Sequence, residues 1–133
     1  MQIFKTVFLG VILALSFIYT NLAYAKDTVN TPPEKITCTD GLCKLDDKYQ
    51  PYLQINNSGS GIYNFDFGYA STNLLYYYYK NDKEQRISIT TTYWTIVADL
   101  TNSNWQKFTN TTYKCTASAN ACPFTGTPYL KNK

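Results

Sequence analysis

Histidine is absent from the 133-residue chain. Its absence excludes serine, cysteine and threonine mechanisms that depend on a histidine base, and it removes the usual ligand of most zinc and non-haem iron sites. Acid–base chemistry would fall to carboxylates, of which Asp66 and Asp99 alone lie within or directly after a predicted strand. A glycosidase would need these two carboxylates to face each other across a cleft. We therefore expect a protein that is not an enzyme and has no cofactor.

Charge of either sign is also sparse. Charged residues make up 16% of the chain, and the net charge is +3. The first 25 residues contain a single charged residue, Lys5, so the rest of the chain has a net charge of +2. A balance this weak, with no basic cluster, argues against nucleic acid or an anionic membrane surface as the partner.

Long apolar runs are missing except near the N-terminus. Lys5 precedes the apolar run 7–19, and small residues follow at Ala23 and Ala25. This layout is typical of a secretory signal helix with an Ala-x-Ala cleavage site, and the run is shorter than the roughly 20 residues that span a bilayer. We expect residues 1–25 to be a cleaved signal peptide. The remaining chain would be exported to the periplasm or the medium, with no membrane insertion after cleavage.

No window of the remaining chain has helical periodicity. Short stretches with strand patterns, separated by turn residues every 8 to 12 positions, predict an all-β fold. We expect a small antiparallel β-sandwich or a partly open barrel, stapled by disulfides. The predicted β domain covers residues 36–124, with an extended lead-in at 26–35 and a loose C-terminal tail at 125–133.

The stretch 74–80 is too aromatic for a loop, and it reads as the middle strand of a meander between strands 61–70 and 86–98. Side chains alternate between the two faces of a strand. One face of the tyrosine strand would therefore present Tyr76 and Tyr78, and the other Leu75, Tyr77 and Tyr79.

The flanking strands have their own patterns. Strand 62–70 places its four aromatic residues on one face by strict alternation. Strand 86–98 is long and its second face becomes apolar halfway, which predicts a bend or bulge near residues 90–92 and a strand shared between two sheets. Pro51 indicates an edge position for strand 49–55. A further strand is expected at 105–115.

Four cysteines in an exported chain predict two disulfides. Asp40-Gly41 is a strong two-residue hairpin turn, which places Cys38 opposite Cys43. The favoured pattern is therefore two local bridges, Cys38–Cys43 and Cys115–Cys122. The rival pattern joins Cys38 to Cys122 and Cys43 to Cys115 across the two end strands. A zinc site is disfavoured because the cysteine spacing is wider than usual for zinc and export favours oxidation.

Aromatic residues are the one class in excess, at 17% of the chain. Many of them would fill the core of a β domain that is poor in leucine and valine. The consecutive tyrosines cannot all hide behind one layer, however, so one aromatic face is expected to be exposed. The exposed pair is either Tyr76 and Tyr78 or Tyr77 and Tyr79. The residues proposed for this face, with a basic rim, are Tyr76, Tyr78, Trp94, Trp105, Lys80 and Arg86.

This pattern predicts an exported, non-catalytic domain that binds a protein partner through its aromatic face. A carbohydrate-binding module is an alternative, with Asn64, Asp66 and Asn104 beside the rings. An enzyme inhibitor, which would use loop 56–61 or loop 118–120, and a small enzyme are further alternatives. Pairing with a second copy of the chain also stays open.

Overall fold

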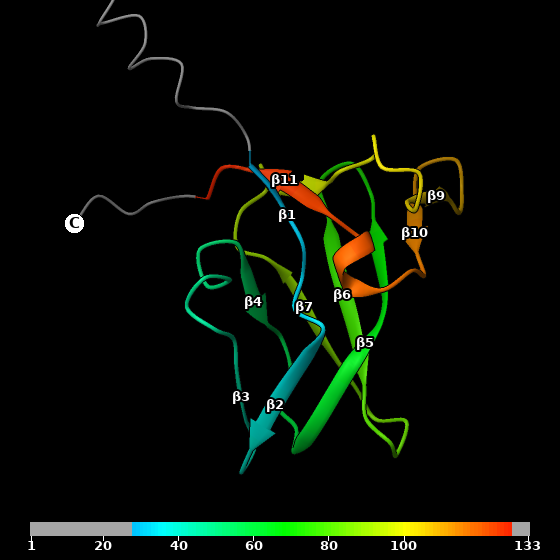
Figure 1. The fold of residues 1–133 in the computed structure, drawn as a ribbon. Helices are drawn as coiled ribbons and strands as arrows, with labels where there is room; N and C mark the ends of the chain where they lie inside the picture. Colours follow the sequence, from blue (N-terminus) through cyan, green and yellow to red (C-terminus); the bar gives the residue numbers. More distant parts are fainter. Residues whose placement is uncertain (1–27, 129–133) are drawn as a thin grey trace, which may run out of the picture.

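The computed structural model describes residues 28–128 as an all-β fold with two antiparallel sheets and two disulfides, which confirms the predicted class. The larger sheet is nearly closed, like a barrel (Figure 1). The predicted signal peptide lies outside the described residues. The elements are β1 Thr28–Asn30, β2 Lys35–Thr39, β3 Leu42–Lys44, β4 Leu53–Ile55, β5 Gly61–Ala70, β6 Leu75–Lys80, β7 Arg86–Thr91, β8 Val97–Ala98, β9 Gln106–Lys107, β10 Tyr113–Cys115, the 3-10 turn η1 Ala119–Ala121 and β11 Phe124–Gly126.

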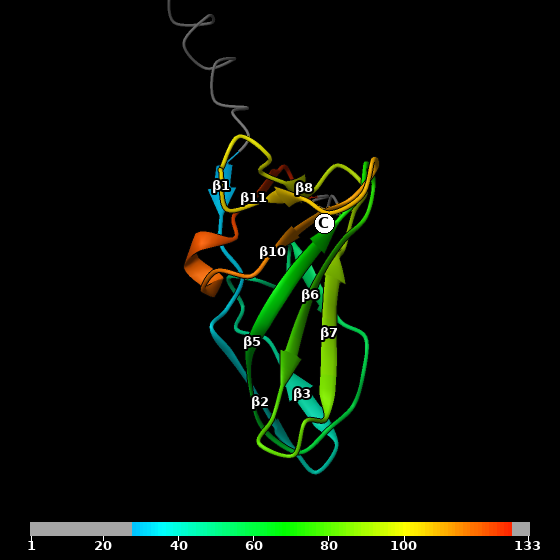
Figure 2. The same cartoon turned by 90° about the vertical axis from the view of Figure 1, so that its right-hand side faces the viewer.

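The larger sheet has the strand order β3-β2-β5-β6-β7-β4, and the hairpin β9–β10 joins it through β5. The tyrosine strand β6 lies between β5 and β7, as the sequence predicts, and these three strands run side by side in Figure 2. Strand β4 lies at an edge, also as predicted, but it begins at Leu53, because residues 49–52 of the predicted strand form turns. The side chains of Leu75, Tyr77 and Tyr79 are fully buried, so this face of β6 packs against the core.

Strand β5 contains a bulge that changes which of its aromatic residues face outward. Phe65 pairs with Tyr79, but Phe67 pairs with Tyr78, so the register shifts at Asp66. An extra residue reverses the alternation of side chains along a strand. The predicted single aromatic face of strand 62–70 is therefore wrong. The first half of β5 directs its rings inward, and the second half directs them outward.

Both favoured disulfides form, and the rival pattern is excluded. Asp40 and Gly41 have φ angles of 52° and 80°. Positive φ at both central residues is what a tight two-residue hairpin turn requires, and this turn places Cys38 directly opposite Cys43. The second bridge spans η1 and joins Cys115 to Cys122, whose side chains are both fully buried.

The smaller sheet has the order β1-β11-β8 and lies at the opposite end of the molecule from the tip of the hairpin β2–β3 (Figure 1). Thr28 pairs with Gly126, and Phe124 pairs with Ala98. Hydrogen-bonded β-strands therefore extend into both the predicted lead-in, 26–35, and the predicted C-terminal tail, 125–133. Strands this short offer too few residues for an alternation pattern to show in the sequence.

Two long predicted strands are divided in the structure. The stretch 86–98 becomes β7 in the larger sheet and β8 in the smaller one, so the predicted sharing between sheets is correct. The stretch 105–115 was predicted as one strand and is instead the hairpin β9–β10, in which Lys107 pairs with Tyr113. Among residues 28–128, no helix is long and apolar enough to cross a membrane.

Hydrogen bonds from buried aromatic side chains fix segments near both ends of the described chain to the core. Tyr77 donates its hydroxyl to the carbonyl of Cys122 at 2.8 Å, and Tyr79 donates to the carbonyl of Pro33 at 2.7 Å. The indole of Trp105 donates to the carbonyl of Pro123 at 2.8 Å. The carbonyl of Pro123 also accepts a hydrogen bond from the backbone amide of Asp99 at 3.0 Å, so two donors share it. The side chains of Tyr77, Tyr79 and Trp105 thus help to satisfy backbone carbonyl groups outside the strands.

The two buried tyrosines predict sensitivity to alkaline pH. Burial raises the pKa of Tyr77 and Tyr79 well above the ordinary value of 10.0, and a neighbouring tyrosine adds to each shift. The unfolded chain ionises near pH 10 while the folded chain does not, so stability present below pH 10 is lost as the pH rises. We expect each residue to lower the free energy of unfolding by about 1 kcal/mol at about pH 10.5. Urea titrations at several pH values would measure this, and Tyr79→Phe should make the loss with pH less steep.

Candidate binding face

The face of β6 opposite the core presents stacked rings. Tyr76 and Tyr78 are half-buried, and their ring centroids are 6.2 Å apart. Phe67, brought to this side by the bulge, stacks on Tyr78 at 4.7 Å with an interplanar angle of 23°. Tyr69 pairs with Tyr76 across the same two strands. We call Phe67, Tyr69, Tyr76 and Tyr78 the aromatic face.

A small notch opens beside the aromatic face, where β10 pairs with β5. It has a volume of about 270 Å³, and we call it the lysine notch; it is lined by Phe67, Tyr69, Tyr78, Phe108 and Lys114. The ammonium group of Lys114 lies 4.4 Å from the ring centre of Phe67 and 5.7 Å from that of Phe108. Phe108 is 63% exposed, so the notch has one aromatic wall that faces solvent.

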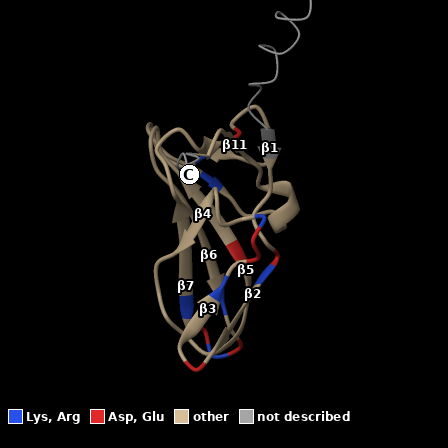
Figure 3. Cartoon of the chain, turned by 90° about the vertical axis from the view of Figure 1, so that its left-hand side faces the viewer, with Lys and Arg blue, Asp and Glu red and all other residues tan. Residues whose placement is uncertain are grey.

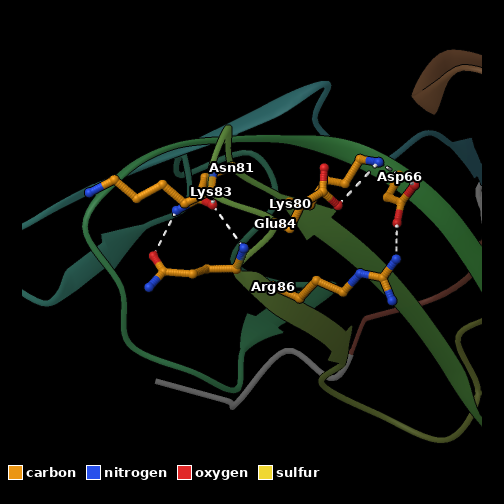
Figure 4. A network of polar contacts seen from close by, with 7 residues as sticks. Asp66, Lys80, Asn81, Lys83, Glu84 and Arg86 are labelled. Carbon is orange, nitrogen blue, oxygen red and sulfur yellow. Dashed lines mark hydrogen bonds and ion pairs between the residues drawn. The ribbon is translucent and has the colours of Figure 1, made fainter.

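A polar cluster borders the other end of the aromatic face (Figure 4). Asp66, the extra residue of the bulge, has Arg86 Nη2 at 3.1 Å from Oδ2 and Lys80 Nζ at 4.0 Å from Oδ1. The Arg86 contact is an ion pair without the alignment of a hydrogen bond. Lys80 also lies 3.8 Å from Glu84. The side chain of Asp66 is 20% exposed, so its charge is held near the sheet surface rather than in open solvent.

The turn between β6 and β7 fixes the ends of this cluster. The side-chain oxygen of Asn81 accepts hydrogen bonds from the backbone amides of Lys83 at 3.0 Å and Gln85 at 2.9 Å. The side-chain amide of Asn81 donates to that of Gln85 at 2.9 Å. Lys80 and Arg86 pair directly across the two strands, so the turn holds both cations beside Asp66.

Figure 3 shows how sparse charge is along the central strands, where β5 has one acidic segment and β7 one basic segment. A larger open groove of about 700 Å³ lies along β2 and β3. Its lining includes Lys35, Lys44, Asp40 and Asp46, so its charges cancel, and threonines separate them. Beside the stacked rings of the aromatic face, by contrast, the cations Lys80, Arg86 and Lys114 outnumber the carboxylates Asp66 and Glu84.

Four of the six predicted binding residues lie together. Tyr76 and Tyr78 belong to the aromatic face, and Lys80 and Arg86 form its rim. Trp94 is 65% exposed but lies between β7 and β8, with its ring 5.7 Å from that of Tyr93.

Trp105 is a correction to the predicted set of binding residues. It is only 5% exposed and its ring lies 6.2 Å from that of Tyr77, so it is a core residue. The position of Gly68 explains this, because a Cβ atom there would lie 2.6 Å from Trp105 Cη2. The indole occupies the space left free by the missing side chain.

Four residues of the site were not among those predicted: Phe67, Tyr69, Phe108 and Lys114. Phe67 and Tyr69 could be placed on this face only with knowledge of the bulge in β5, which the alternation of residues in the sequence does not reveal. Phe108 and Lys114 come together with them only because β10 pairs with β5, with Lys114 opposite Tyr69. A turn signal within 105–115 would have indicated the hairpin. The segment Asn110-Thr111 is the candidate for that turn, but it is a weak turn signal.

The two carboxylates considered for catalysis both have structural contacts. Asp66 lies on the same side of the sheet as Phe67, rather than opposite the aromatic residues, and pairs with the cations described above. Asp99 starts a turn and accepts hydrogen bonds from the amide and the hydroxyl of Thr101. Among residues 28–128, no group of three acidic, cysteine or histidine side chains could hold a metal ion.

Comparison of the chain with protein families, curated proteins and solved structures found no match.

Proposed function

We propose that this chain is an exported, non-catalytic domain that binds a protein partner through the aromatic face. The observation that carries the proposal is the contrast along β6. Tyr77 and Tyr79 are fully buried, whereas Tyr76 and Tyr78, on the same strand, remain partly exposed beside Phe67. Packing in the core explains why Tyr77 and Tyr79 are tyrosines. It does not explain Tyr76 and Tyr78, which no second layer of the fold covers within residues 28–128.

The composition of this surface supports a protein partner. Tyrosine and arginine are the residues that most often dominate protein interfaces, because they bury large areas while retaining a polar group. The rings stack on one another along β6 and across to β5, so little side-chain entropy would be lost on binding. Two disulfides in a small β domain support export, because such bonds persist in oxidising compartments.

Replacing Tyr76 and Tyr78 by alanine tests the proposal. We expect the double variant to fold and to lose at least about 30-fold in affinity for proteins retained from the extracellular fraction of the producing cells, because each ring is a hot-spot candidate. Trp94→Ala is the control, since it removes a large and more exposed aromatic side chain outside the face. Circular dichroism checks folding, and biolayer interferometry measures affinity for the retained protein.

Three results would count against the proposal. Retention unchanged in the double variant, or lost in Trp94→Ala instead, would move the site away from the aromatic face. Unfolding of the double variant would make Tyr76 and Tyr78 core residues. Binding to a glycan array that disappears in the double variant would indicate a carbohydrate-binding module in place of a protein-binding one.

A further inference from the structure

Lys114 and Arg86 both lie over the ring of Phe67, at 4.4 Å and 5.8 Å from its centre, but within residues 28–128 only Arg86 is paired with a carboxylate, that of Asp66. The ammonium group of Lys114 also lies near the ring of Phe108, and the residue is partly buried. A lysine held against aromatic rings has lost part of its hydration, and an anion that reaches it there interacts more strongly than one in open water.

No acidic group of the described chain neutralises Lys114. The ion pairs formed among residues 28–128 join Lys80 and Arg86 to Asp66 and Glu84, and none of them includes Lys114. These five charged side chains of the face and its rim therefore include three cations and two carboxylates. The unbalanced positive charge is the one in the lysine notch.

The walls of the notch favour a particular anion. Tyr69 and Tyr78 line it together with two phenylalanines. No hydrogen bond within residues 28–128 engages the hydroxyl of either tyrosine, so both can donate to a ligand. One ammonium group with two phenolic donors among aromatic walls fits a carboxylate attached to an apolar group. A phosphate would require several cationic or amide donors, which the notch lacks.

We propose that the lysine notch takes an Asp or Glu side chain of the protein partner, with a neighbouring apolar residue of that partner on the aromatic face. This inference rests on the proposed function and specifies the chemistry of the partner. The charge of the notch complements the acid, and its volume of about 270 Å³ suits one side chain rather than a folded segment. Lys114 would then exchange its contact with Phe108 for a charge-assisted hydrogen bond.

A library of random dodecapeptides displayed on phage, selected against the full exported chain, tests the inference. We expect the selected peptides to contain Asp or Glu next to Leu, Ile, Phe or Tyr. One selected sequence is then synthesised together with its twin, in which Gln replaces the acidic residue. Fluorescence anisotropy measures the dissociation constants of both peptides.

The variants Lys114→Gln and Lys107→Gln provide the matched comparison. Each removes one positive charge while keeping much of the aliphatic stem, and Lys107 lies on the adjacent strand, where it is exposed and does not line the notch. We expect Lys114→Gln to weaken binding of the acidic peptide by about tenfold and Lys107→Gln to change it by less than about twofold. The acidic peptide and its twin should bind Lys114→Gln about equally, because the pair is already broken.

The outcomes separate this inference from the proposed function. Selected peptides that depend on Tyr76 and Tyr78 but show no acidic preference would overturn the inference and leave the proposed function standing. Equal losses in Lys114→Gln and Lys107→Gln would also overturn it, because the effect would then be long-range charge attraction. Failure to enrich any peptide beyond the level of the Tyr76→Ala and Tyr78→Ala double variant would count against both.

Discussion

Tyr77→Ala is expected to lower the free energy of unfolding by about 4 kcal/mol, whereas Tyr78→Ala, one residue along the strand, is expected to lower it by about 1 kcal/mol. Tyr77 is fully buried among Phe65, Trp105 and Phe124, whose ring centres lie 5.9–6.2 Å away. Its truncation leaves a cavity and also leaves the carbonyl of Cys122 without its donor.

Both variants replace a tyrosine of the same strand by alanine, and they differ mainly in the face of the sheet on which that tyrosine lies. The comparison therefore isolates the effect of burial on the free energy of unfolding. Tyr78 is half-buried, with the rings of Phe67 and Tyr76 as its neighbours, and it lies on the face of β6 opposite the core, so its removal opens no internal cavity. Urea unfolding followed by the fluorescence of buried Trp105 measures both free energies. Equal losses would show that both faces of β6 are core, and the aromatic face would then have no claim to be a binding surface.

Gly126→Ala is expected to lower the free energy of unfolding by about 4 kcal/mol, through two separate effects. Gly126 has a φ angle of +136°, which side chains disfavour, and such strain costs about 1–3 kcal/mol. A Cβ atom there would also collide with the carbonyl oxygen of Thr95 and lie 2.8 Å from Ile96 Cα. These are backbone atoms, which cannot rotate away, so overpacking adds about 1–3 kcal/mol.

Gly61→Ala is the control for the second prediction. Its φ angle is +97°, but a Cβ atom there would meet nothing within 4 Å. It should therefore show the conformational cost alone, about half the loss expected for Gly126→Ala. Differential scanning calorimetry on both variants measures the difference. A loss in Gly126→Ala no larger than in Gly61→Ala would mean that the β8–β11 contact is looser than described.

Local chemistry made the hairpin and the central strand predictable. Asp40-Gly41 determines a turn that places two cysteines opposite each other, and nothing outside those six residues is needed. The tyrosine run of β6 contains no turn residue and has no helical periodicity, so a β-strand was the only secondary structure that its sequence matched. Its two faces could be assigned by alternation, although the sequence could not tell which of them faced the core.

The site was less predictable because distant pairings assemble it. The bulge at Asp66 leaves the sequence alternation of β5 intact while reversing its faces, so Phe67 and Tyr69 were assigned together with Tyr63. Trp105 looks like a surface aromatic in sequence, but Gly68, 37 positions earlier, provides its place in the core. Contacts at this separation leave no periodic signal in a single sequence.

The pairing of β1 with β11 has a consequence for how the chain acquires its shape. β11 is the central strand of the smaller sheet, and within residues 28–128 it supplies the ladder partner of both β1 and β8. A ribosome makes the first of these strands long before the last. The smaller sheet therefore stays open until residues 124–126 are released, and a growing chain cannot lock into its final topology before β11 has been made.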